Sequence, residues 1–185
     1  MKIKKLSDDE FYSFFPTLFA EHFKDSMNFS IMNVRSQSEL DQAERLKQHM
    51  KAGDALHFAV YDDNDKLMGW STSRQMRMYE LYTMNSVILP EFRRKGLYSM
   101  LVKETVKEAR ALGYQMVTSN HVISNNAVII AKLKLGFNIS GIEVFDDFGM
   151  TVKLTCHLNE TRKKAFDFRT GLTRPDDEIR KLMQL

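Results

Sequence analysis

The alternation of hydrophobic and polar positions divides the chain into short strands and amphipathic helices. Residues 2–6 alternate polar and apolar side chains, as a half-buried strand does. Segments 56–61 and 67–76 are rich in hydrophobic, aromatic and β-branched residues and flank the acidic turn at 62–65, which predicts a β-hairpin. Further strands are predicted at 79–89, 114–122, 137–145 and 149–158.

Capping residues mark the predicted helices. Ser7 with Glu10, and Ser36 with Glu39, have the spacing of a capping box. The first box opens a helix with an aromatic stripe, which Pro16 is expected to divide. The stripe is expected to pack in the core, or else to contribute part of the wall of an acceptor pocket. The stripe consists of Phe11, Phe15, Leu18, Phe19 and Phe23.

The second box opens a helix that carries Leu40, Ala43, Leu46 and Met50 and ends near Gly53. Helices are also predicted at 97–112 and 126–135, the latter capped by Ser124 or Asn125. A glycine suited to a left-handed C′ position follows each of these two helices.

The order of these elements predicts a mixed α/β (α+β) fold. The strand, helix and strand between 79 and 122 require a parallel crossover, whereas the hairpins elsewhere are antiparallel. We therefore expect a mixed, mostly antiparallel central sheet of about six or seven strands, flanked by about four helices.

Composition restricts the class of protein. The 185 residues, 43% of them hydrophobic, suffice for one domain over 1–158 with a C-terminal extension over 159–185. Residues 173–178 predict the start of a short helix, docked either on the domain or on a second protomer, as in a homodimer. Arg162, Lys163, Lys164 and Arg169 are expected to be solvated, or else to assist an anionic acceptor.

The net charge of +3, spread along the chain, predicts neither a nucleic-acid nor a membrane partner. Cys156, the single cysteine, excludes an intrachain disulfide and a cysteine-based metal cluster, and it is expected to be an inert core thiol. The acidic turn lacks the residues of a calcium loop, so no metal is expected. Without an apolar N-terminal segment or span, a cytoplasmic location is expected.

A basic, glycine-containing loop joins the strand at 79–89 to the helix at 97–112. It reads Arg93-Arg94-Lys95-Gly96-Leu97-Tyr98. Unpaired N–H groups and the positive end of a helix dipole bind anions, so the loop predicts a phosphate or pyrophosphate site. The alternative is a solvated loop.

Two sequence blocks resemble the GNAT (GCN5-related N-acetyltransferase) superfamily. The loop, preceded by Pro90-Glu91-Phe92, resembles its acetyl-CoA signature, and the block from Asn125 to Gly136-Phe137 resembles its second motif. The resemblance covers about residues 1–158. It implies the GNAT fold, with the sheet splayed between its fourth and fifth strands, and transfer of an acetyl group from acetyl-CoA to a primary amine on a small molecule or peptide.

The resemblance also implies a set of cofactor-binding residues. Backbone N–H groups from Arg94 through Ser99, with Lys95, Gly96, Leu97 and Tyr98 between them, would bind the pyrophosphate, and the Arg93 and Lys95 side chains would add charge. Ser86, Val87 and Ile88 would offer a free strand edge to the pantetheine amides. Asn125 would also contact the pantetheine, or simply cap its helix. Tyr98 departs from the signature, which has Gly or Ala there.

Three residues are candidates for catalysis. Glu80, on a central strand, is a candidate general base, or else an edge-facing solvated residue or a salt-bridge partner in the core. His121 titrates in the right range, although a lone strand histidine is commonly a core residue. Lys132 occupies the family's usual tyrosine position and is a candidate acid for the leaving thiolate, or else a snorkelling surface lysine; Tyr82 and Tyr98 are substitute donors.

Two functions follow from this reading. The first is an acetyl-CoA-dependent N-acetyltransferase that works by direct transfer. The second, motivated by the missing tyrosine, is a non-catalytic CoA- or acyl-CoA-binding regulatory module on the same fold.

Overall fold

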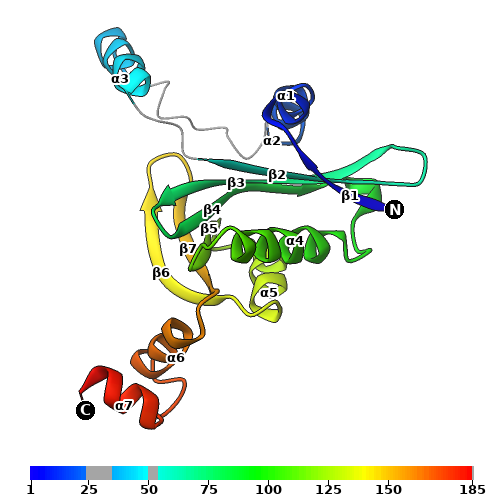
Figure 1. Ribbon diagram of the computed structural model, residues 1–185. Coiled ribbons are helices and arrows are strands. Elements are labelled where there is room, and N and C mark those ends of the chain that lie inside the picture. The colour runs from blue at the N-terminus through cyan, green and yellow to red at the C-terminus, as the bar shows by residue number, and fades with distance from the viewer. Residues whose placement is uncertain (24–34, 50–53, 185) are drawn as a thin grey trace.

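A seven-stranded sheet forms the centre of the molecule in the computed structural model, which describes residues 1–23, 35–49 and 54–184 (Figure 1). Its strand order is β1-β2-β3-β4-β5-β7-β6, and only the β4–β5 pair is parallel. The mixed, mostly antiparallel sheet predicted from the sequence is therefore confirmed. The strands are β1 (Lys2–Leu6), β2 (Ala55–Tyr61), β3 (Leu67–Arg77), β4 (Glu80–Ile88), β5 (Met116–Val122), β6 (Asn138–Phe145) and β7 (Gly149–His157).

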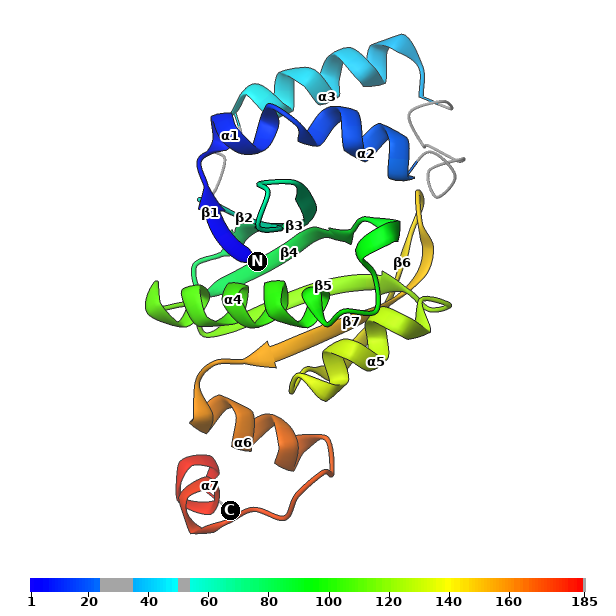
Figure 2. The ribbon, with the colours of Figure 1, turned by 90° about the vertical axis from the view of Figure 1, so that its right-hand side faces the viewer.

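Helices cover both faces of this sheet (Figure 2). On one side lie α1 (Asp8–Tyr12), α2 (Phe15–Phe23) and α3 (Gln37–His49). On the other side lie α4 (Leu97–Ala111) and α5 (Asn126–Lys134), with the short 3₁₀ helix η2 (Pro90–Phe92) before α4. The C-terminal helices α6 (Glu160–Arg169) and α7 (Asp177–Met183) extend beyond β7.

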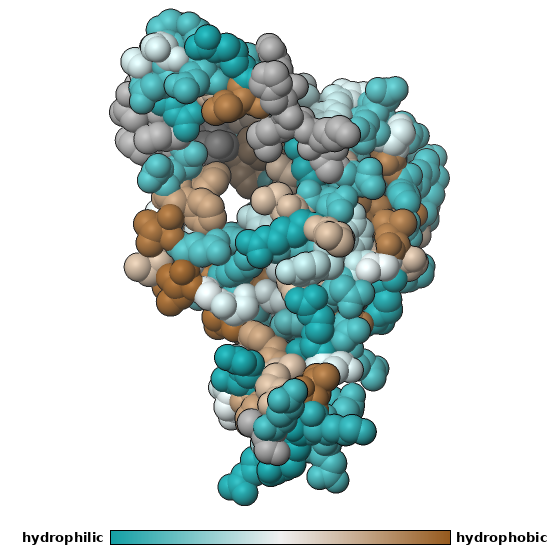
Figure 3. Space-filling view, turned by 60° about the vertical axis from the view of Figure 1, so that its left-hand side comes forward, coloured by the Kyte–Doolittle hydropathy of each residue, from teal (hydrophilic) through white to brown (hydrophobic). Residues whose placement is uncertain are grey.

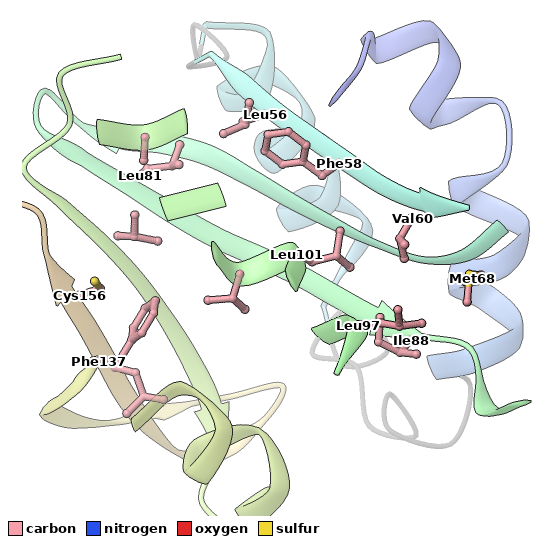
Figure 4. Close-up of a cluster of buried hydrophobic side chains, with 14 of the residues drawn as sticks. Leu56, Phe58, Val60, Met68, Leu81, Ile88, Leu97, Leu101, Phe137 and Cys156 are labelled. Atoms are coloured by element: carbon pink, nitrogen blue, oxygen red, sulfur yellow. The ribbon is translucent and has the colours of Figure 1, made fainter. Parts of the chain in front are cut away.

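Side chains along each strand point alternately to the two faces of the sheet, and a separate hydrophobic cluster lies on each face. Leu56, Phe58 and Val60 of β2 face α4, where they pack with Leu97 and Leu101 (Figure 4). The cluster on the opposite face packs against α1 and α2 and is built from Leu6, Phe11, Ala59, Trp70, Val87 and Leu89. Burial of apolar surface at about 25 cal/mol per Å² on both faces holds the central strands in register.

The face seen in Figure 3 is largely hydrophilic, with separate hydrophobic groups near the level of the sheet. The lower end, formed by the C-terminal helices, is mostly hydrophilic as well.

Local signals in the sequence place the N-terminal helices correctly. In both predicted capping boxes, the N-cap backbone N–H donates to the glutamate carboxylate over 2.8 Å. The first predicted helix is divided, but the break lies before Phe15, and Pro16 occupies the first turn of α2. A proline there loses no helical hydrogen bond. Met50 and Gly53 lie outside the described residues.

The C-terminal extension contains a helix, α6, that the sequence analysis did not predict, because it has no buried apolar stripe. The Phe166 ring lies 4.8 Å from His157, and the Arg162 guanidinium lies 4.6 Å above the Tyr79 ring, so Arg162 packs on the domain although we expected it to be solvated. The second predicted helix, α7, begins after Asp176 and buries Ile179. Whether 1–158 and 159–185 are separate units stays a prediction.

The parallel pair β4–β5 is short, so the two strands lie apart over most of their length. The two strands pair only from Glu80 to Tyr82 on β4 and from Met116 to Thr118 on β5. On β4 the pairing with β3 shifts by one residue at Met84, which forms a bulge between Thr83 and Asn85. A bulge bends its strand and changes its twist. Beyond Tyr82 the strands separate, so the predicted splay between the fourth and fifth strands is confirmed.

Candidate active site

A cleft of about 580 Å³ opens where β4 and β5 separate. Its walls come from the end of α2, the second half of β4, the loop before α4, and the first turns of α4 and α5. The lining residues are His22, Phe23, Ser86, Val87, Ile88, Phe92, Arg93, Arg94, Gly96, Leu97, Tyr98, Asn125, Ala127, Val128 and Ala131. The size is typical of a pocket for a small organic ligand.

The loop before α4 holds an unusual backbone conformation. Arg94 has φ +62° and Gly96 has φ +78°, both in the left-handed region. A Cβ added at Gly96 would meet no protein atom within 4 Å, so within the protein the requirement for glycine is conformational. The left-handed Gly96 is followed directly by the right-handed first residue of α4, and such a pair turns successive N–H groups toward one side, which favours an anion.

The N-terminus of α4 opens into the same cleft. Gly96 is the N-cap residue, and it has no side chain that could accept from the first-turn N–H groups. Arg94 lines the cleft beside this helix end, whereas the Arg93 Nε donates to the Ile88 carbonyl over 3.0 Å and so ties the loop to β4. The helix dipole and one guanidinium therefore make this end of the cleft electropositive.

Lys132 of α5 follows Ala131, which lines the cleft, but is not itself a lining residue. It is buried, with 1% of its surface exposed. Its ammonium donates to Ser119 Oγ over 2.6 Å and lies 4.7 Å from the centre of the Phe137 ring. The alternative of a snorkelling surface lysine was therefore wrong, because the folding of α5 against β5 directs this side chain inward.

His121 joins the same cluster. Its Nε2 lies 2.9 Å from Ser119 Oγ, so one hydroxyl links the lysine and the histidine. Burial lowers the pKa of His121 to about 3, with the Lys132 charge as a second cause. Burial also lowers the pKa of Lys132 to about 7, while Cys156 opposes that shift. Cys156 is itself buried, and burial raises the pKa of its thiol.

Glu80 lies at the start of β4, on the face of the sheet opposite α4. Leu81, the next residue, packs in the cluster against α4, and consecutive strand residues point to opposite faces. The buried Glu80 carboxylate accepts a 2.7 Å hydrogen bond from Thr118 Oγ1 and lies 3.7 Å and 3.8 Å from the cationic groups of Arg77 and Lys153. These contacts match the expected core ion pair, and its role as a base stays a prediction.

Comparison with known proteins identifies the family. A profile of the acetyltransferase (GNAT) family matches residues 10–137, which is more than half of the chain. The chain belongs to the GNAT family. A search of curated proteins found no match.

Solved GNAT-like acetyltransferases share the fold. Nourseothricin acetyltransferase is 19% identical with a TM-score of 0.52, over 57% of this chain and 66% of that chain. Ribosomal-protein-S18-alanine N-acetyltransferase from Escherichia coli is 16% identical (TM-score 0.58; 85% and 94% covered). A spermidine N-acetyltransferase chimera from Vibrio cholerae and hSSAT is 15% identical (TM-score 0.62; 86% and 98% covered).

The chain therefore spans slightly less than two thirds of the nourseothricin enzyme and nearly all of the other two. These identities establish the fold, and the family profile establishes a GNAT-type N-acetyltransferase. Most GNAT positions predicted from the sequence as cofactor-binding line the cleft. Lys95 and Ser99 are the exceptions, and the Lys95 ammonium lies 5.5 Å above the Phe92 ring.

Several lining residues were not predicted. Val128 and Ala131 follow Asn125 at helical spacing, so the periodicity of α5 contained that signal. His22 had no such signal, because only the packing of α2 over the sheet brings it to the cleft. Phe23 belongs to the aromatic stripe, for which a pocket wall was one of the two predicted alternatives.

Two further residues on the cleft wall have more than one contact. Asn125 caps α5 by accepting from the Val128 N–H over 3.4 Å, as predicted, and it also faces the cleft. Tyr98 lines the cleft and packs against the large core cluster, and burial raises the pKa of its phenol. Tyr98 is therefore a wall of the cleft, at a position where the GNAT signature has a small residue.

Among the described residues, no group of three or more His, Cys, Asp or Glu side chains is arranged to hold a metal ion. None of the helices in the described part of the chain combines the length and apolarity needed to cross a membrane.

Proposed function

We propose that this GNAT protein transfers an acetyl group from acetyl-CoA directly to a primary amine. The observation that carries the proposal is the cleft itself. It begins at the electropositive N-terminus of α4 and runs along the separated edge of β4 toward the β4–β5 junction. A ligand with an anionic end and an extended, amide-containing arm fits such a cleft.

The residues present fit both parts of acetyl-CoA. The free N–H groups at the start of α4 and the Arg94 guanidinium suit a pyrophosphate, because charge-assisted hydrogen bonds are the strong ones. Ser86, Val87 and Ile88 present a strand edge beyond the β4–β5 pairing, which suits the pantetheine amides. Asn125 faces that arm from α5. Lys95 remains a candidate phosphate contact through its backbone.

The acceptor would approach from the face opposite α4. Glu80 and Tyr82 lie on that face beside the junction, and Asn120 of β5 donates to Glu143 over 2.6 Å there. The neutral amine would attack the thioester carbonyl carbon, the carbon–sulfur bond would break, and the amide nitrogen would release one proton. A small-molecule or peptide amine suits this site, in a soluble cytoplasmic protein with no nucleic acid or membrane partner.

Calorimetry and thiol release together test the proposal. We expect submillimolar binding of acetyl-CoA and amine-dependent release of CoA thiol, measured with a disulfide dye over a broad panel of amines. Binding without thiol release for every amine would instead support the regulatory module. No measurable acetyl-CoA binding would refute both functions.

A further inference from the structure

A continuous apolar surface lies at the edge of the sheet, on the same face as α4. Ile139 and Ile142 of β6 pair with two β7 residues that belong to the core cluster packed against α4. Cross-strand partners point to the same face of a sheet, so both isoleucines point to the α4 face. Val144 and its partner Met150 follow on that face, because side chains alternate along a strand. These four side chains are 49–75% exposed, so no helix in the described part of the chain covers them.

Two residues of α5 continue this surface. Only residues 135–137 separate α5 from β6, so the last turn of the helix adjoins the start of the strand. Ala131 lines the cleft and Lys132 points to β5, which fixes two sides of the helix. At about 100° per residue, Ile130 and Leu133 share a third side, and both are exposed. The β6 surface therefore consists of Ile130, Leu133, Ile139, Ile142, Val144 and Met150.

Core packing holds α5 along one side only. The helix has nine residues, of which Lys132 is buried and Ile129 packs partly against the core cluster. Isolated helices shorter than about 12–15 residues are marginal in water, so their stability comes from packing. Another side of α5 borders the open cleft. A partner that covers Ile130 and Leu133 would therefore stabilise one wall of the cleft from behind.

The area of the β6 surface suits a protein interface. Its six large apolar side chains, each exposed by about half, present on the order of 500 Å² of apolar surface, and a patch of about this size is often functional. In an interface of standard size each partner buries about 800 Å², roughly 60% of it apolar. The β6 surface of one copy therefore matches the apolar part of one side of such an interface.

The charges around the β6 surface favour a second copy of the chain as the partner. Lys134 follows Ile130 by four residues, so it lies on the same side of α5, near the start of β6. Asp146 stands at the other end of β6, in the turn to β7. Glu143, the charged residue of β6 itself, points to the opposite face, where it accepts from Asn120. The surface is thus uncharged in the middle, basic at one end and acidic at the other.

We infer that the β6 surface binds a second copy of this chain about a two-fold axis that lies in the interface, perpendicular to β6. This axis places Lys134 of each copy beside Asp146 of the other, while the apolar side chains pack on one another. An axis parallel to β6 would instead bring like charges together. The register shift between Ile139 and Gly141 interrupts the edge of β6, so the copies meet through the faces of their sheets and not by extending the sheet. None of these residues lines the cleft, so the inference is independent of acetyl transfer.

Sedimentation velocity of the full chain, from about 1 µM to about 100 µM, measures the association. We expect a concentration-dependent dimer and no larger species, because a two-fold interface closes. Ile142→Lys should raise the dimer Kd about 100-fold or more, because each copy then buries an unpaired charge. Leu182→Lys is the matched control. Leu182 is an aliphatic residue on α7, 57% exposed against 64% for Ile142, and its replacement should leave the Kd within about threefold of wild type.

Three results would overturn the inference. A wild-type protein that stays monomeric at about 100 µM has no second copy on this surface. A dimer that persists in Ile142→Lys, with folding verified by circular dichroism, does not use this surface. A dimer that is lost in Leu182→Lys uses α7 instead, the other docking position that the sequence allows.

Charge reversal tests the direction of the axis. Lys134→Asp and Asp146→Lys should each raise the dimer Kd about three- to tenfold, because each reversal occurs twice in the dimer although exposed ion pairs are weak. The double variant Lys134→Asp/Asp146→Lys should return the Kd to near the wild-type value at low salt, since both pairs form again with their signs exchanged. Losses that simply add in the double variant would refute the antiparallel arrangement.

Discussion

The affinity for CoA should depend on Arg94 much more than on Lys95. Both are cations in the loop before α4, but only Arg94 lines the cleft. Because Arg94 has φ +62°, asparagine is the suitable replacement, since it removes the charge and tolerates the left-handed region. A hydrogen bond to a charged group contributes about 1.5–3 kcal/mol. Arg94→Asn should therefore weaken CoA binding about tenfold to about 150-fold, at 1.4 kcal/mol per factor of ten.

Isothermal titration with CoA measures this difference directly. Lys95→Asn makes the same change in charge one residue away, so general electrostatic attraction affects both variants alike. We expect the Lys95→Asn Kd to stay within about threefold of wild type. The Arg94→Asn effect should also shrink as salt is raised, because screening weakens partly exposed charge pairs.

Equal losses in the two variants would show that the loop acts only through its net charge. An unchanged Kd in Arg94→Asn, with both proteins folded by circular dichroism, would place the phosphates elsewhere. Either result would refute the assignment of the α4 N-terminus as the anion site.

Three further predictions concern the frame of the site. Gly69→Ala should lower the free energy of unfolding, measured in urea, by about 1–3 kcal/mol, because the new Cβ would meet the Val87 carbonyl oxygen. The control Gly141→Ala, where the nearest contact of a new Cβ is at 3.9 Å, should change that free energy little, and equal effects in the two variants would contradict the packing argument. The pKa of His121 in the folded protein lies below its value of about 6.5 in the unfolded chain, so the unfolded chain takes up a proton as pH falls through 6.5 and the fold loses stability. The free energy of unfolding of wild type, relative to that of His121→Gln, should therefore drop by about 2 kcal/mol from pH 7 to pH 5. A difference that does not change with pH would refute this prediction. Asn125→Asp should keep the melting temperature, because both residues cap helices, but it should weaken CoA binding about two- to tenfold, because the amide donor is lost. An unchanged Kd would show that Asn125 acts only as a helix cap.

The local elements could be read from the sequence because their signals are local. A capping box needs only Ser7 and Glu10, and a left-handed helix end needs only a glycine directly after the helix, as at Gly113 and Gly136. The strand assignments likewise depended on alternation within each segment. The helix that the sequence analysis missed, α6, also has a local reason, because it is polar and has no buried apolar stripe to detect.

The cleft required the relation between elements. The motif predicted that Arg94 and Asn125 act on one ligand, but only the early separation of β4 from β5 shows where that ligand has room. His22 reaches the cleft through the packing of α2, which no pattern within α2 encodes.

The sequence by itself determined the element order, the anion-binding loop and the resemblance to the GNAT family, because each depends on residues close together in the chain. Only the tertiary structure decided the state of Lys132. Its aliphatic neighbours fit a surface lysine as well as a buried one, and burial depends on which face of α5 meets β5. That packing places the ammonium on Ser119, at the junction where β4 and β5 separate.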